Sequence, residues 1–244
     1  MARSQFDEEA KRFGTVLRSL HWCHATPAQP RGYRADLLGA RWWKGHFSGM
    51  MTRMKGVFVA VVGPDGVGKT TFARGLVAAL GDGVRYFHFR PPVRGELAAV
   101  VPDPTPLPKR KERPSHVGGW ARIALAVVRF WAGYIVSVSP VLRNGEVVIG
   151  DRWSYGYLVH PVSVGFAGPR WLARWAVSLM PTPDVVFNLA APASVILERK
   201  AELTREEVEF ELEVLPQLPA PVVTLDATRD PATLVAEALE VIGR

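Results

Sequence analysis

The sequence predicts an α/β fold in which a five-stranded parallel sheet is flanked by helices. Short apolar segments rich in β-branched residues recur along the chain, and helical patterns alternate with them. Continuous apolar segments are typical of strands buried on both faces, and right-handed crossovers between such strands make the sheet parallel. The strands are expected at residues 57–63, 84–90, 146–150, 184–190 and 221–227.

One of the expected helices, in GWARIALAVVRFWAGYIVSVSP, is nearly long and apolar enough to cross a bilayer. Arg122 and Arg129 recur seven residues apart on one of its faces, however, and two arginines in lipid are costly. We therefore expect no transmembrane segment here, but a buried helix whose two arginines face a polar site. The helices are expected at residues 69–81, 119–138, 170–180, 193–215 and 231–243.

Residues 1–54 differ in pattern from the rest and are expected to form a helical N-terminal appendage to one α/β domain at 55–244. The alternatives for the appendage are packing on the domain or a dimer partner, and docking to a partner protein or a membrane. A basic, proline-rich loop is expected at 101–114. Apolar residues at helical spacing indicate one amphipathic helix in the appendage: Phe6, Phe13, Val16, Leu17 and Leu20.

The 244 residues carry a formal net charge of +7, with a pI near 9.8. Such a balance attracts phosphorylated ligands, nucleic acid or an anionic membrane. The basic residues are scattered and not massed on one helix, which does not favour nucleic acid. Cys23 is the only cysteine, so an intramolecular disulfide is excluded and a reducing compartment is indicated. The polar N-terminus has no signal-peptide core, and a cytoplasmic protein is expected.

The segment GPDGVGKTT (63–71) has the spacing G-x-x-x-x-G-K-T between an expected strand and an expected helix, which predicts the P-loop NTPase fold. Glycines let backbone N–H groups face nucleotide phosphates, and the helix N-terminus adds a positive dipole end. Lys69 is expected to neutralise the β- and γ-phosphates, and Thr70 to hold Mg²⁺. The predicted nucleotide-binding residues are Gly63, Asp65, Gly66, Val67, Gly68, Lys69, Thr70 and Thr71.

Kinases, GTPases and motor proteins share that loop, so other segments must discriminate between them. The chain has no N-K-x-D for guanine recognition, and no consecutive acids follow the strand EVVIG. Instead Asp151 and Arg152 follow it, where one acid can serve Mg²⁺ and an arginine can meet a substrate phosphate. A salt-bridged strand end is the alternative interpretation of this pair.

These segments together resemble the thymidylate kinase family. The resemblance covers residues 56–244 and rests on GPDGVGKTT, HFRPP, PVLRNGEVVIGDRW, PDVVFNLAAPASVILERK and LDATRDPATLVAEAL, in the family's order. It implies a kinase that transfers a phosphoryl group from ATP, with Mg²⁺, to a small acceptor. It also implies that Arg90 and Arg152 contact the acceptor phosphate, that Asp151 lies at Mg²⁺, and that Asp65 meets an acceptor sugar hydroxyl.

The same resemblance implies that an arginine of the long helix, here Arg129, helps to hold the acceptor, and that Ala227 and Thr228 border the adenine. In this family a catalytic arginine comes from the phosphate loop or from a mobile lid. The loop offers none at its variable positions, so the lid segment ERKAELTREE becomes its expected source. Its candidate cations are Arg199, Lys200 and Arg205; the alternative for them is a solvated helix face paired with Glu198, Glu202 and Glu206.

The segments WSYGYLVHPVSVGFAGPRW and RPPVRGE differ from the family pattern, and both fall in the expected acceptor pocket. The leading expectation for the acceptor is a nucleoside monophosphate. Two alternatives remain: a kinase for a nucleoside, a sugar phosphate or a glycoconjugate intermediate, with Asp65 or Asp151 as general base, and a nucleotide-gated binding protein with little turnover. Thymidylate kinases are commonly dimers, so the apolar 119–138 helix is a candidate surface for a second copy.

Overall fold

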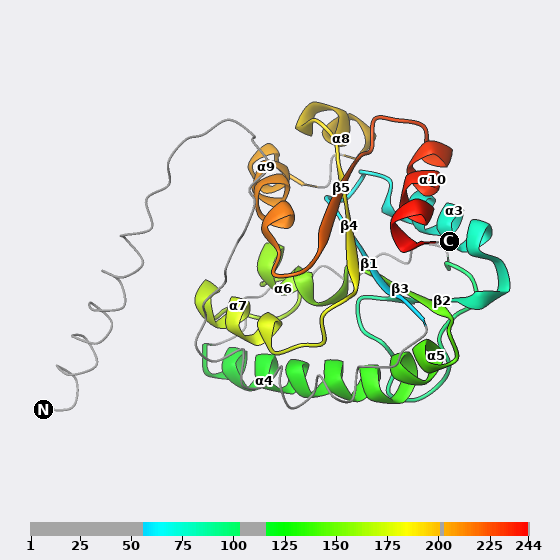
Figure 1. Cartoon of the computed structure of the whole chain (residues 1–244). Coiled ribbons are helices and arrows are strands. Elements are labelled where there is room, and N and C mark those ends of the chain that lie inside the picture. Colours follow the sequence, from blue (N-terminus) through cyan, green and yellow to red (C-terminus); the bar gives the residue numbers. More distant parts are fainter. Residues whose placement is uncertain (1–55, 103–115, 201–202, 244) are drawn as a thin grey trace, which may run out of the picture. The chain divides into compact units, whose positions relative to one another are not determined.

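The computed structural model describes residues 56–102, 116–200 and 203–243. Within them five strands form one sheet, in which every neighbouring pair is parallel (Figure 1). The strand order is β2-β3-β1-β4-β5, so the strand that precedes the glycine-rich loop lies at the centre. This confirms the predicted parallel sheet. The strands are β1 (Phe58–Val62), β2 (Val84–His88), β3 (Val147–Asp151), β4 (Val185–Ala190) and β5 (Val222–Asp226).

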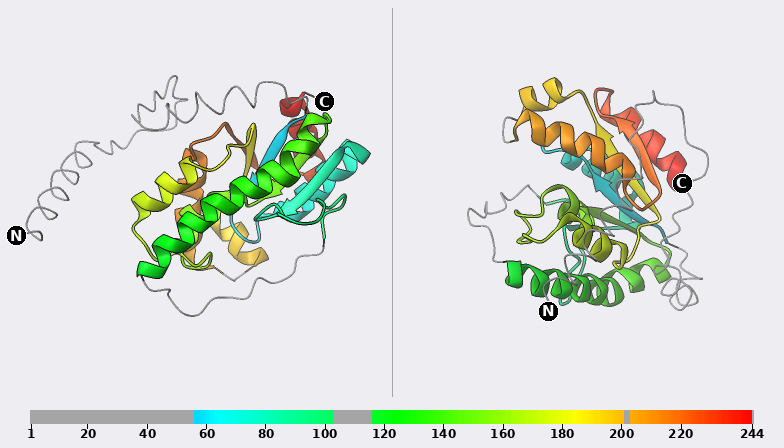
Figure 2. Two further views of the ribbon diagram at one scale, coloured as in Figure 1. Left: turned by 90° about the horizontal axis from the view of Figure 1, so that it is seen from below. Right: turned by 90° about the vertical axis from the view of Figure 1, so that its left-hand side faces the viewer.

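Helices cover both faces of the sheet (Figure 2). Phe58 and Ala60 of β1 point into a core shared with α4 and α7, whereas Val59 and Val61 point into a core shared with α3 and α10. The strand has no polar residue because both of its faces are covered. The α-helices are α3 (Lys69–Leu80), α4 (His116–Gly133), α5 (Ser139–Arg143), α6 (Gly156–Val159), α7 (Arg170–Ser178), α8 (Ala193–Arg199), α9 (Arg205–Val214) and α10 (Pro231–Ile242). Shorter turns are the 3₁₀ segments η1 (Gly81–Gly83), η3 (Trp153–Tyr155) and η4 (Leu215–Gln217), and the π-helix η2 (Tyr134–Val138).

An aromatic cluster supports the segment that follows β3. Trp153 is fully buried, and its ring meets Phe58 and Phe130 edge-on at centroid distances of 4.9 and 4.8 Å. Its indole Nε1 donates a hydrogen bond to the carbonyl of Pro181 at 3.1 Å. Edge-on aromatic contacts are directional, and a buried indole with a satisfied N–H has one preferred position. The two residues before Trp153, which carry the predicted chemistry, are therefore attached to a fixed point of the core.

The long apolar helix is α4, continued by η2 and α5 (Figure 1). From Gly119 to Arg143 it is long and apolar enough to cross a membrane by length and composition alone, and 44% of its most apolar stretch is buried. The expectation that this helix is buried is wrong in part, because one of its faces is exposed. Only the face with Ile123 and Phe130 packs against the sheet, so Arg122 and Arg129 are exposed.

The helix expected at 193–215 is two helices, α8 and α9. Lys200 has an extended backbone that ends α8, and Thr204 begins α9 with a capping box. The Thr204 hydroxyl accepts from the backbone N–H of Glu207, while the Glu207 carboxylate accepts from the N–H of Thr204. The T-x-x-E pattern of this box was present in the sequence. The predicted N-terminal helix, the boundary at residue 54 and most of the 101–114 loop lie outside the described residues.

Candidate active site

The glycine-rich loop between β1 and α3 has the backbone that its sequence predicts. Gly63, Gly66 and Gly68 have φ values of 145°, 94° and 109°, which residues with a Cβ rarely adopt. A Cβ on Gly66 would also lie 2.8 Å from the Cβ of Lys200, so only glycine permits the lid to approach the loop this closely. Gly68 caps α3, so the first turn of that helix directs its N–H groups toward the loop.

Lys69 is the buried cation of the loop, with 7% of its side chain exposed. Its Nζ donates to the carbonyls of Gly63 and Pro64 at 2.7 and 2.8 Å, and it pairs with the Asp65 carboxylate at 3.1 Å. Burial lowers the pKa of Lys69, the charge of Arg152 lowers it further, and Asp65 opposes both effects. The ammonium is thus held within the phosphate loop by two carbonyls and one carboxylate.

Asp65 connects the phosphate loop to the end of β3. One oxygen of its carboxylate accepts from Arg152 at 2.5 Å and from Lys69 at 3.1 Å. Burial raises the pKa of Asp65, but the charges of Lys69 and Arg152 outweigh it and lower the pKa from 3.8 to about 2. Asp65 is therefore an ionised bridge between two cations.

Asp151 ends β3 and is only 5% exposed. Its Oδ2 accepts from the Tyr86 hydroxyl at 3.1 Å and lies 3.0 Å from the Nδ1 of His88. Oδ1 is buried and has no hydrogen-bond partner among the described residues. Burial raises the pKa of Asp151, but the His88 hydrogen bond and the charge of Lys69 outweigh it, so the pKa is lowered. One carboxylate oxygen is thus fixed by the protein, and the other is left for an external ligand.

Arg90 lies two residues beyond the end of β2, beside the aromatic cluster. Its Nη2 donates to the Tyr157 hydroxyl at 3.1 Å, and its guanidinium lies 4.9 Å from the ring centroid of Phe89. Its Nε has no partner among the described residues. Burial raises the pKa of Tyr157, and the charges of Arg90 and Arg129 partly offset this effect. The exposed Arg129 therefore lies on the Arg90 side of the site.

The end of α4 and the π-helix η2 that follows it contact the Arg90 segment. A Cβ on Gly133 would lie 2.5 Å from the carbonyl oxygen of Pro91, so the helix and the Arg90 segment touch backbone to backbone. In the next turn the Ser137 hydroxyl donates to the carbonyl of Pro92 at 2.5 Å. π-Helices occur mostly as single turns within α-helices, often at functional sites. Here the extra residue in the turn coincides with the contact that positions Arg90.

Backbone strain marks the same edge of the sheet. Among the described residues, three non-glycine residues have a positive φ: Phe89 (62°), Arg152 (67°) and Trp153 (45°). All three follow the ends of the neighbouring strands β2 and β3. The strained turns are held by backbone hydrogen bonds, from Phe89 N–H to the Asp151 carbonyl and from Arg152 N–H to the Val61 carbonyl, each 2.8 Å. Such strain typically persists where a site fixes a side-chain direction.

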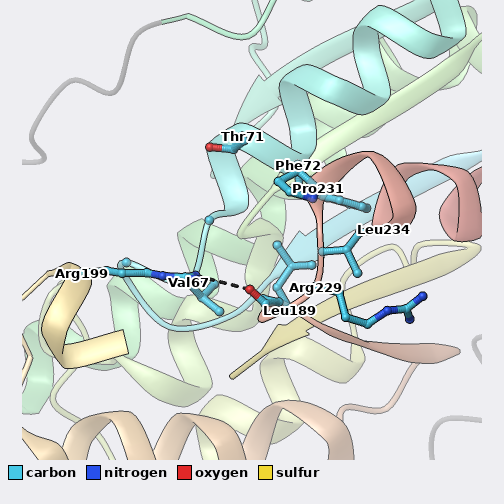
Figure 3. A pocket seen from close by; sticks show the side chains of 11 residues that line it. Val67, Thr71, Phe72, Leu189, Arg199, Arg229, Pro231 and Leu234 are labelled. Carbon is cyan, nitrogen blue, oxygen red and sulfur yellow. Dashed lines mark hydrogen bonds between the residues drawn. The ribbon is translucent and has the colours of Figure 1, made fainter. Parts of the chain in front are cut away.

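A cavity of about 340 Å³ opens from the other side of the phosphate loop (Figure 3). Arg199 at the end of α8 forms one wall and donates from Nη1 to the carbonyl of Ala227 at 3.3 Å. Leu234 and Phe72 contribute apolar wall area. The cavity therefore combines apolar wall area with an arginine and adjoins the phosphate loop. The lining residues are Gly66, Val67, Gly68, Thr71, Phe72, Leu189, Arg199, Ala227, Arg229, Pro231 and Leu234.

The remaining predicted residues lie at varying distances from this centre. Thr70 is the half-buried second residue of α3. The Thr228 hydroxyl donates to the Asp226 carboxylate, and Arg229, not Thr228, lines the cavity. Arg205 is exposed and pairs within α9 with Glu209 at 3.5 Å, which is not one of the three acids expected as its partners. Of the three lid cations, Lys200 is the one whose stem lies against the loop, at Gly66.

Three residues of the site were not predicted from the sequence: Tyr86, His88 and Tyr157. The first two alternate with buried residues at the end of β2, so the two-residue period of a strand places them on one face. Polar residues at the carboxyl end of a strand in a parallel sheet were a usable signal for both. Tyr157 lies in the WSYGY segment, whose path depends on the burial of Trp153 and has no local sequence signature.

Known proteins resemble this chain in sequence and in structure. The sequence model described as thymidylate kinase matches residues 61–222, about two thirds of the chain. A probable thymidylate kinase of Thermoplasma acidophilum is 25% identical over 165 residues, which are 64% of this chain and 77% of that protein. The crystal structure of thymidylate kinase from Ehrlichia chaffeensis is similar over 77% of this chain and 98% of its own, with 15% identity and a TM-score of 0.45. With the phosphate loop, the Asp151–Arg152 pair and Arg90 at one edge of the sheet, the chain belongs to the thymidylate kinase family of P-loop nucleotide kinases.

Proposed function

We propose that this protein transfers the γ-phosphoryl group of ATP, with Mg²⁺, to the phosphate of a nucleoside monophosphate. The observation that carries the proposal is the position of Arg90 and Arg152. They follow the ends of the neighbouring strands β2 and β3, and each has a buried Nε without a partner among the described residues. Guanidinium groups with unused donors bind phosphate oxygens in a fixed direction. Two such groups at the ends of neighbouring strands, one of them close to Lys69, suit an acceptor that already carries a phosphate.

The charge of Asp65 supports a phosphate acceptor over a hydroxyl acceptor. A hydroxyl must lose its proton to a general base, and such a base works best with a pKa near the working pH. The pKa of Asp65 is lowered to about 2 by Lys69 and Arg152, which makes it a weak base. A phosphate oxygen is already nucleophilic and needs no base. We propose that Asp65 instead accepts a hydrogen bond from an acceptor hydroxyl while it holds Arg152.

The donor is proposed to lie on the opposite side of the loop. Its base enters the cavity between Arg199 and Ala227, and its phosphates reach the N–H groups of the loop and Lys69. The negative charge of the transferring group is spread over three oxygens, so positioned cations supply most of the catalysis. Lys69, Arg152 and Lys200 of the lid are the cations placed to do so. Arg199 is better placed to contact the base than the transferring group.

The residues at the end of β3 fit Mg²⁺. The free Oδ1 of Asp151 is a buried carboxylate oxygen, which is the ligand type that Mg²⁺ prefers, and the hydroxyl of Thr70 is expected to serve as a second ligand. The bound ion would neutralise charge on the β- and γ-phosphates. Tyr86 and His88 hold Oδ2 and so keep Oδ1 directed toward the ion.

A product assay tests this function. Purified protein is incubated with MgATP and one of several acceptors: nucleoside monophosphates including dTMP, nucleosides, and sugar phosphates. The proposal predicts an acceptor-dependent increase in ADP and an equal amount of a nucleoside diphosphate, both absent with EDTA. Phosphorylation of a nucleoside hydroxyl, or slow ATP hydrolysis that no acceptor accelerates, would contradict it.

We also infer that a second copy of the chain packs on α4. Its exposed face carries small and aliphatic side chains at alternating spacings of four and three residues, the pattern of a helix that packs on another helix. Sedimentation velocity of the wild-type protein at micromolar concentration would show a dimer. The variant Val128→Glu would sediment as a monomer. A monomeric wild-type protein would contradict the inference. The face consists of Ala121, Leu125, Val128, Ala132 and Ile135, three of them at least 47% exposed.

A further inference from the structure

One buried charge in the described part of the chain is not used by the proposed chemistry. The buried charged residues there are Lys69, Asp151 and Glu211, and the first two lie at the phosphates. Glu211 is 2% exposed, and its Oε1 lies 2.6 Å from Nε2 of His160. A buried carboxylate is costly unless it is paired, so the position of His160 is tied to that of Glu211.

The pair joins the segment that follows Arg152 to helix α9. His160 is the residue that caps the short helix α6, eight residues after Arg152. Glu211 lies in α9, the helix that begins where the lid segment ends. A neighbouring contact strengthens the same junction, because the guanidinium of Arg170 lies 4.6 Å from the ring centroid of Phe210. α9 is thus held at two adjacent residues by the chain that follows the acceptor-binding arginine.

A small cavity of about 30 Å³ lies between this pair and the phosphate loop. Its walls include Gly63 of the loop, Arg152, His160 and Glu211. Residues of the pair and Arg152 thus line one hollow, so a shift of α9 changes the surroundings of Arg152. The His160–Glu211 pair therefore adjoins both the loop and the arginine that meets the acceptor.

We propose that the His160–Glu211 pair is a positioning element that fixes α9, and with it the lid, relative to Arg152. This role extends the proposed function, and the effects on KM expected from it rest on that function. The pair contacts neither nucleotide, so its effect is on the geometry of acceptor binding. The charged groups that face His160 are Glu211 from α9, Asp65 from the loop and Arg152 from the end of β3.

The titration of His160 gives the pair a pH dependence. Burial lowers the pKa of His160, but the hydrogen bond and charge of Glu211 and the charge of Asp65 outweigh it, so the pKa is raised above 6.5. The ion pair is therefore complete below that raised pKa. As the pH rises through it, His160 becomes neutral and the pair weakens. Acceptor binding in the wild type should weaken over the same pH range.

The test compares Glu211→Gln and His160→Gln with Glu209→Gln, which removes an exposed charge from the same helix. Each substitution in the pair should speed hydrogen exchange in α9 and residues 153–160, while β1 and β4 keep the wild-type rates. With dTMP as the acceptor probe, we expect the acceptor KM to rise roughly three- to tenfold at pH 6.5, with the ATP KM within about twofold. Both variants should lose the pH dependence of the acceptor KM.

Two results would overturn the inference. One is faster exchange spread evenly over the domain, with acceptor and ATP KM changed alike, which is the behaviour of a merely structural pair. The other is wild-type exchange in α9 of both variants. If the wild type phosphorylates no acceptor, the proposed function fails, but the exchange pattern still decides whether the pair fixes α9.

Discussion

The substitution Asp65→Asn removes the bridge between the phosphate loop and the end of β3. In the unliganded protein the Asp65 carboxylate pairs with Lys69 at 3.1 Å and Arg152 at 2.5 Å, and its side chain is 21% exposed. Its pKa falls from 3.8 to about 2 because these two cations outweigh the effect of burial. At roughly 1.4 kcal/mol per pKa unit, the ionised form contributes about 2 to 3 kcal/mol to the free energy of unfolding at pH 7.

Urea unfolding at pH 7, followed by circular dichroism, measures this contribution. We expect Asp65→Asn to lower the free energy of unfolding by about 2 kcal/mol. The matched control is Glu209→Gln, because Glu209 pairs with Arg205 on the surface and both side chains are more than half exposed. That control should change stability by less than about 0.5 kcal/mol.

The sign of the pH dependence is fixed by the lowered pKa. A depressed carboxylate pKa stabilises the folded state above the ordinary value of 3.8, and this stabilisation is lost as the pH falls toward 2. The difference between wild type and Asp65→Asn should therefore be constant from pH 5 to pH 7 and should shrink below about pH 4. A difference no larger than that of Glu209→Gln at pH 7, or one that grows as the pH falls, would refute the reasoning.

Two further predictions concern residues that support the site. Tyr86→Phe removes one of the two groups that hold Oδ2 of Asp151. Calorimetry should show that Mg²⁺ affinity in the presence of ATP falls about tenfold, while Mg²⁺-free ATP binding is unchanged. An unchanged Mg²⁺ affinity would exclude this role of Tyr86. Gly133→Ala places a Cβ against the Pro91 carbonyl and should displace Arg90, which raises the acceptor KM roughly tenfold and leaves ATP binding intact. Steady-state kinetics with a varied acceptor measures the second effect, and equal loss of ATP and acceptor binding would count against it.

Most of the fold was predicted from the sequence, because the hydrophobic pattern that marks each strand lies within a short segment of the chain. β1 is a continuous apolar segment, and β3 and β4 are apolar except for Asp151 and Asn188, which is typical of strands buried on both faces. The glycines of the phosphate loop specify its backbone. The break between α8 and α9 was missed because the helical pattern continues through it. Its cause, the capping box at Thr204, is local and could have been recognised.

The candidate site was less predictable, because its contacts join residues far apart in the chain. Asp65 was expected near the acceptor, but the sequence could not show that Lys69 and Arg152 share its carboxylate. The partners of Asp151 come from β2, 63 and 65 residues earlier, and follow from strand order. Arg199 was one of three candidate lid cations, and the sequence could not show its hydrogen bond to the carbonyl of Ala227. Such contacts depend on how the strands are ordered in the sheet.

The central claim is that acceptor and donor occupy opposite sides of the phosphate loop, and paired kinetics on Arg90→Ala and Arg199→Ala tests it most directly. Each variant loses one guanidinium, so each is the control for the other. Arg90→Ala should raise the acceptor KM about tenfold or more, while the ATP KM stays within about twofold of the wild-type value. Arg199→Ala should raise the ATP KM and leave the acceptor KM unchanged. If Arg90→Ala weakens ATP binding as much as acceptor binding, or leaves the acceptor KM unchanged, the assignment of the two sides is wrong.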